Sequence, residues 1–121
     1  MYAAERRKMN RYEVPGAWVI FRYGEGRPRA GVLNDISFSA VCFKSEKSFN
    51  PGVSMDMIIS LPGKDDINIK GHVIRAAKLS AKDIYYVVVQ FLIFGTDPRY
   101  NSIYSYKQLK DLNDSLVDTV H

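Results

Sequence analysis

The sequence predicts an all-β fold: a six-stranded antiparallel (split) β-barrel with a C-terminal α-helix. Three observations support this prediction. From Ala17 onward, short segments rich in Val, Ile, Phe and Tyr recur between turn-forming residues. In residues 54–61 the apolar side chains fall at every second position, which is typical of a strand with one buried face. After Asp97-Pro98 the apolar spacing changes to three or four residues, which indicates a helix.

The predicted strands follow one another at short intervals. Turn formers at 24–28 separate the first two strands and predict a hairpin, and Pro62-Gly63 follows the fourth strand. Trp18 has apolar neighbours on the first strand, so we expect it in the core. The six strands are expected at residues 17–23, 29–34, 40–44, 54–61, 67–77 and 84–94.

A chain of 121 residues is expected to form one compact domain. Its parts are a mobile basic arm (1–16), the barrel (17–97) and the helix (98–116). Asp97 suits the helix N-cap and Pro98 the first helical position. One stripe of the helix is expected to cover an open end of the barrel; it comprises Ile103, Tyr106, Leu109, Leu112 and Leu116.

The composition narrows the functional class. Hydrophobic residues make up 46% and charged residues 25%, and no apolar run is long enough for a membrane span or a signal peptide, so we expect a cytoplasmic protein without membrane insertion. Cys42 is the single cysteine and is expected to be a buried thiol, and with only His72 and His121 as imidazoles no metal cofactor is expected. No Gly-x-Ser-x-Gly motif or paired nucleophile and base is present, so we expect no enzymatic activity.

Positive charge gathers at the N-terminus of a chain whose formal net charge is +4. Residues 1–11 contain three arginines and a lysine against one glutamate, which favours an anionic partner. Pro15-Gly16 separates this polar arm from the barrel, so the arm is expected to be mobile without ligand.

Two short motifs lie on opposite sides of the predicted hairpin. Arg7 and Arg11 form Arg-x-x-x-Arg, and Asp35 and Ser37 form Asp-x-Ser. Alone, the first is more typical of a solvated helical turn or a loose tail, and the second of an ordinary turn. In this order they resemble the PilZ family, whose signature is Arg-x-x-x-Arg followed by Asp/Asn-x-Ser-x-x-Gly, and the resemblance covers roughly residues 5–112. Ala40 replaces the glycine of this signature, which implies weakened rather than abolished binding because glycine allows closer backbone approach.

The resemblance implies a receptor for cyclic di-GMP, with no further cofactor. Arginine pairs bidentately with phosphate or with guanine O6 and N7, so the arginines would clamp phosphates and Hoogsteen edges. Asp35 would accept from guanine N1 and N2, and Ser37 would bind the ligand or hold the turn that aims Asp35. The implied ligand-binding residues are Arg6, Arg7, Arg11, Asp35, Ser37 and Ala40. On the fifth strand His72 and Arg75 are expected to face opposite sides, so at most one of them can line the site, and the pattern favours a solvated strand residue for each.

The implied mechanism is an order–disorder switch, in which the ligand orders the arm and the domain signals in trans to an unidentified effector protein. Motility and exopolysaccharide synthesis are outputs that the resemblance suggests. Two alternatives are a PilZ-like adaptor without ligand binding and a small basic barrel that binds single-stranded nucleic acid. The clustering of charge in the arm favours the receptor over the nucleic-acid barrel. A homodimer through an exposed sixth strand or the helix stripe is also consistent with the sequence.

Overall fold

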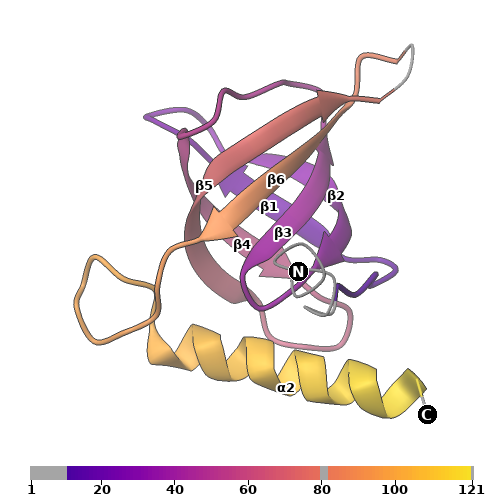
Figure 1. Ribbon diagram of the computed structural model, residues 1–121, viewed down its shortest axis with the longest axis vertical. Coiled ribbons are helices and arrows are strands. Elements are labelled where there is room, and N and C mark those ends of the chain that lie inside the picture. Colours follow the sequence, from indigo (N-terminus) through magenta and orange to yellow (C-terminus); the bar gives the residue numbers. More distant parts are fainter. Residues whose placement is uncertain (1–10, 80–81, 121) are drawn as a thin grey trace, which may run out of the picture.

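The computed structural model describes residues 11–79 and 82–120. Six antiparallel strands close into a barrel in the order β1-β2-β3-β6-β5-β4, and one helix lies across an open end (Figure 1). The predicted fold class is confirmed, with the barrel closed. The elements are β1 (Trp18–Arg22), β2 (Arg29–Ile36), β3 (Ala40–Ser45), β4 (Ser54–Ser60), β5 (Ile67–Lys78), β6 (Tyr85–Phe91) and α2 (Ile103–Val120).

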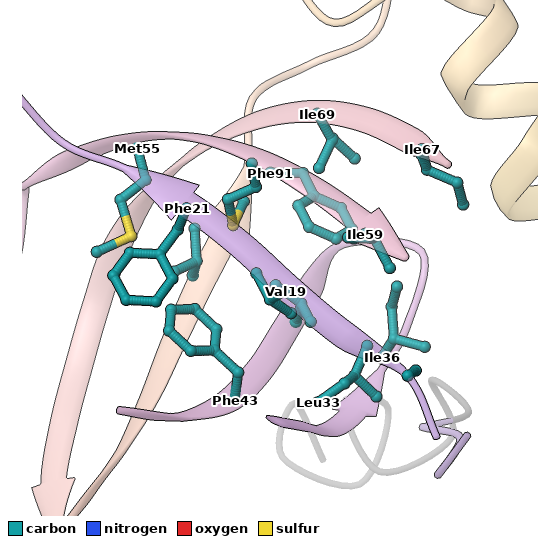
Figure 2. Packing of buried hydrophobic residues seen from close by; sticks show 14 of the residues in the cluster. Val19, Phe21, Leu33, Ile36, Phe43, Met55, Ile59, Ile67, Ile69 and Phe91 are labelled. Atoms are coloured by element: carbon teal, nitrogen blue, oxygen red, sulfur yellow. The ribbon is translucent and has the colours of Figure 1, made fainter. Parts of the chain in front are cut away.

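The core fills the barrel interior with alternate residues of every strand. In β4, Met55, Met57 and Ile59 are buried, which confirms the period-two prediction. The rings of Phe21 and Phe43 face each other across the interior with centroids 4.8 Å apart (Figure 2). Trp18 is not in the core: its neighbours Ala17 and Val19 point inward, so alternation puts Trp18 on the outer face, 47% exposed.

Strand β5 has 12 residues and changes partners along its length. Residues 67–72 pair with β4 and residues 71–78 pair with β6. Gly71 lies where the two pairings overlap, and a Cβ there would collide with the carbonyl oxygen of Gln90, so closure of the barrel requires glycine. Because β6 pairs with both β3 and β5, it is not an exposed edge, which corrects the expectation that it pairs with a second copy.

The helix begins at Ile103, five residues later than the predicted start at 98. Asp97 does not cap it. Its carboxylate instead accepts from the amide of Arg99 at 2.8 Å and from the Arg99 guanidinium, which closes a turn on residues 97–100. The N-cap is Ser102, whose Oγ accepts from the amide of Ser105 at 3.0 Å.

The segment between β6 and α2 fastens the helix to β5. Strand β6 ends at Phe91 rather than the predicted 94, and from there on the free edge of β5 is occupied by Asn101. The Asn101 side chain accepts from the amide of Lys70 at 2.6 Å and donates to the carbonyls of Lys70 and Leu92, both at 2.9 Å. Asn101 is 3% exposed, so this end of β5 is satisfied without another strand.

The predicted helix stripe is correct in its centre. Leu109 and Leu112 are buried in the main core cluster, and α2 covers the open end of the barrel. Tyr106 is half-exposed and contacts the rings of Phe38 and Phe94. Ile103 is 42% exposed, and its place on the inner side is taken by Ser105, whose Oγ donates to the carbonyl of Asn68 at 2.6 Å. Within the described part of the chain, no helix is both long and apolar enough to cross a bilayer.

Candidate ligand-binding site

The Asp-x-Ser motif forms the tight turn between β2 and β3. The Ser37 hydroxyl accepts from the amides of Ser39 at 3.3 Å and Ala40 at 3.2 Å, and the Ser37 amide donates to the carbonyl of Ala40 at 2.9 Å. One serine side chain therefore satisfies the inward-pointing amides of this turn, as an ST-type motif does.

A bulge in β2 turns Asp35 outward. Leu33 pairs with Phe43 and Asp35 with Cys42, so Asn34 is an extra residue between them. Leu33 and Ile36 are buried on the inner face, and Asp35 is half-buried on the outer face. The side-chain amide of Asn34 donates to Asp35 Oδ2 at 2.8 Å, and no described residue donates to Oδ1. The carboxylate therefore retains acceptor capacity toward a ligand.

The end of the N-terminal arm is paired to the same turn. The Tyr12 amide donates to the carbonyl of Ile36 at 2.8 Å, and the Ile36 amide donates back at 2.9 Å. This pairing fixes exposed Arg11 next to the Asp-x-Ser turn, although Pro15-Gly16 follows it. Arg6 and Arg7 lie outside the described residues.

Strand pairing extends the site into a row across four strands. Asp35 pairs with Cys42, Cys42 with Val88, and Val88 with Arg75. All four lie on the outer face, because the partners that alternate with them are buried in the barrel. The row runs from β2 through β3 and β6 to β5.

His72 and Arg75 face the same side, which corrects the prediction that they face opposite sides. The register of β5 shifts between Val73 and Arg75, so Ile74 is an extra residue there. His72 pairs with outward-facing Gln90 and Arg75 with outward-facing Val88. The bulge therefore turns the Arg75 side chain outward, although Arg75 lies three positions after outward-facing His72.

Cys42 lies at the middle of this face and is buried, as the sequence predicts. The pKa of its thiol is raised to about 11, mainly by burial and secondly by the negative charge of Asp35. The positive charges of Arg11 and Arg75 act in the opposite direction on the same pKa. Charges from the arm, β2 and β5 thus converge on one point of the outer face.

Small side chains form the floor between these charges. Ala40 and Cys42 on β3 and Val88 on β6 are outward-facing and at least half-buried. Ala40 pairs with Gln90, and a hollow of about 460 Å³ next to this pair is lined by His72, Gln90, Phe91, Leu92, Ile93, Arg99 and Tyr100. This floor was not predicted from the sequence. The available signal was the absence of polar residues at outward-facing positions 42 and 88.

A separate hollow of about 640 Å³ lies on another part of the barrel, between β1, β4, β5 and the start of α2. Its walls include Ile20, Ile58, Tyr100 and Tyr104, and the ion pair of Arg22 with Asp56, 3.8 Å apart. None of the predicted site residues that the structure describes lines it. Among the described residues, no group of three His, Cys, Asp or Glu side chains is placed to hold a metal ion.

A family model described as the PilZ domain matches residues 5–104, more than half of the chain. The matched span includes both motifs and all six strands. The chain belongs to the PilZ domain family. This confirms the resemblance drawn from the two motifs, and Ala40 remains the position where this PilZ domain departs from the family signature.

Solved structures with the same fold are similar to this PilZ domain at low sequence identity. The apo structure of K. pneumonia MrkH has a TM-score of 0.75 and 12% identity, and the match covers 92% of this chain and 51% of MrkH. MrkH in complex with c-di-GMP has a TM-score of 0.71 and 13% identity, with 92% and 52% covered.

Bacillus subtilis MotI/DgrA, an inhibitor of motility, has a TM-score of 0.67 and 15% identity, with 88% of this chain and 49% of MotI covered. The chain therefore spans about half the length of each of these proteins. No curated protein matches this chain by sequence.

Proposed function

We propose that this PilZ domain is a receptor for cyclic di-GMP and binds it on the outer face formed by β2, β3, β6 and β5. The observation that carries the proposal is the motif geometry: Asp35 is turned outward by a bulge, next to a turn that Ser37 holds and beside Arg11. The solved complex of MrkH with c-di-GMP, which has the same fold, supports the choice of ligand.

The proposed roles follow from donor and acceptor chemistry. Arg6, Arg7 and Arg11 clamp the phosphodiesters and guanine O6 and N7, since a guanidinium fork pairs with both. Asp35 accepts from guanine N1 and N2 through its available oxygen. Ser37 acts by holding the turn, and the Ala40 methyl lies on the floor of the site, where glycine would leave more room.

We further propose that the ligand orders the arm ahead of Tyr12. The paired amides of Tyr12 and Ile36 support this, because they give the arm a fixed anchor at the site. Closure of the arm would create a new surface for an effector protein and signal to it in trans, in the cytoplasm and without catalysis by this domain. Regulation of motility or exopolysaccharide synthesis is the kind of output proposed.

Calorimetric titration with cyclic di-GMP, GMP and cyclic di-AMP tests the proposal. The wild-type domain is expected to bind cyclic di-GMP selectively, and Arg7→Ala is expected to weaken binding at least tenfold through loss of a charge-assisted contact. Arg29→Ala, an exposed arginine at the far end of β2, is the matched control and should bind as wild type does. Absence of binding in both wild type and Ala40→Gly would overturn the proposal.

A further inference from the structure

An arginine that belongs to neither motif ends the row of outward-facing residues that starts at Asp35. Two strand pairs separate Arg75 from Cys42 and three separate it from Asp35. With neighbouring strands about 4.8 Å apart, its Cα lies roughly 10 Å from Cys42 and roughly 14 Å from Asp35. Arg75 therefore stands at the opposite border of the small-residue floor from Arg11 and Asp35.

The orientation of Arg75 depends on a specific irregularity. Without the extra residue at Ile74, the side chain at 75 would point into the barrel, opposite to His72. Bulges commonly re-aim one side chain beside a functional site. Here the bulge places a guanidinium on the same face as Asp35, although the two residues lie on β5 and β2.

The charge of Arg75 is not used within the fold. Arg22 pairs with Asp56 at 3.8 Å, and Arg99 pairs with Asp97 at 2.8 Å. Arg75 is exposed and forms no ion pair or hydrogen bond with any described residue. The positive charges of Arg75 and Arg11 both act to lower the pKa of the Cys42 thiol, so the two arginines border the same part of the floor.

We propose that Arg75 contacts the ligand and holds one phosphodiester of cyclic di-GMP from the β5 side, across the floor from Arg11. The ligand has two phosphodiesters on opposite sides of a ring, and a guanidinium on each side of the floor lets both of them be contacted at once. Ala40, Cys42 and Val88 supply the flat surface between the two borders. This inference rests on the proposed function and adds a barrel residue to a charge set that the motifs confine to the arm.

The test compares wild type, Arg75→Ala, Arg75→Lys and Arg29→Ala by calorimetric titration with cyclic di-GMP. Arg75→Ala is expected to bind about tenfold more weakly. Arg75→Lys is expected to recover part of the loss, because it restores charge but not the bidentate fork. Arg29→Ala, an exposed arginine outside the row, is expected to match wild type. Thermal unfolding of each variant checks that the fold is retained.

If wild type binds and Arg75→Ala binds equally well, the role of Arg75 is refuted and the receptor function stands. If wild type and Ala40→Gly both fail to bind, both proposals fall.

A second measurement is independent of substitution at Arg75. A ligand across the row covers Cys42, so saturating cyclic di-GMP is expected to slow thiol labelling of Cys42 at least severalfold. Labelling at the same rate with and without ligand would place the ligand off the row and refute the inference.

Discussion

Two polar clusters on the outside of the barrel differ in how their polar groups are used. Where α2 meets β5, Asn101 and Ser105 are each 3% exposed, and their side chains hydrogen-bond to backbone groups of Lys70, Leu92 and Asn68. On the face from β2 to β5, Arg11 and Arg75 are exposed and form no ion pair with any described residue. Among the same residues, the Asp35 carboxylate has only the side-chain amide of Asn34 as a partner.

The difference separates groups that hold the fold from groups available to a ligand. A buried polar group that loses its partners costs the full free energy of desolvation. An unpaired charge at the surface adds little to the stability of the fold but binds an opposite charge without first breaking an internal contact. Changes at the junction of α2 with β5 (Asn101 and Ser105) should therefore lower stability. Changes on the ligand face, which runs from β2 to β5, should lower affinity.

The largest expected effect is at the junction. Asn101→Ala removes three hydrogen bonds and leaves the partly buried Lys70 amide and Leu92 carbonyl without their Asn101 partner, so the free energy of unfolding is expected to fall by about 3 kcal/mol. Urea denaturation measures this, with exposed Asn50→Ala as the control at less than about 0.5 kcal/mol. A loss below about 1 kcal/mol would show that Asn101 does not secure the edge of β5.

Asp35→Ala is the sharpest test on the ligand face. Loss of the carboxylate that faces guanine is expected to weaken binding of cyclic di-GMP about 30-fold, or about 2 kcal/mol, with little change in stability. Asp83→Ala is the control, since the Asp83 side chain is 95% exposed at the far end of the barrel. A large loss of stability in Asp35→Ala with unchanged affinity would show that Asp35 holds the fold and does not bind the ligand.

The pH dependence of stability tests the burial of Cys42. The pKa of its thiol is about 11 in the folded protein against 9.0 as its ordinary value, so above pH 9 the unfolded chain loses a proton that the folded protein keeps. Stability should therefore fall as pH rises, by about 1 kcal/mol between pH 8 and pH 10 from this group. Urea denaturation of wild type and Cys42→Ala at both pH values isolates the contribution of this thiol. An equal change in the free energy of unfolding between the two pH values in both proteins would contradict the prediction.

The smallest expected effect concerns the departure from the family signature. Ala40→Gly removes a methyl group from the floor, and binding of cyclic di-GMP is expected to tighten about threefold, or less than about 1 kcal/mol. Isothermal titration of wild type and Ala40→Gly measures the change. Weaker binding by Ala40→Gly would mean that the methyl group contacts the ligand favourably.

Local patterns were sufficient to predict the strands and the motif turn. Segments rich in Val, Ile, Phe and Tyr between turn formers placed all six strands to within three residues of their observed ends, and the turn at Ser37 depends on groups within three positions of it. The helix start was misplaced because Asp97 and Ser102 are both good caps, and only the packing of residues 92–101 against β5 selects the second.

By itself, then, the sequence determined the fold class and the motif residues, because these follow from short-range periodicity and spacing, and the resemblance of the two motifs to the PilZ signature indicated the family. Only the tertiary structure decided the direction of Arg75, the exposure of Trp18 and the role of Asn101. Each of these depends on how strands far apart in the chain pair when the barrel closes. A single extra residue at Ile74 reverses which face Arg75 occupies, and no alternation within β5 alone reveals it.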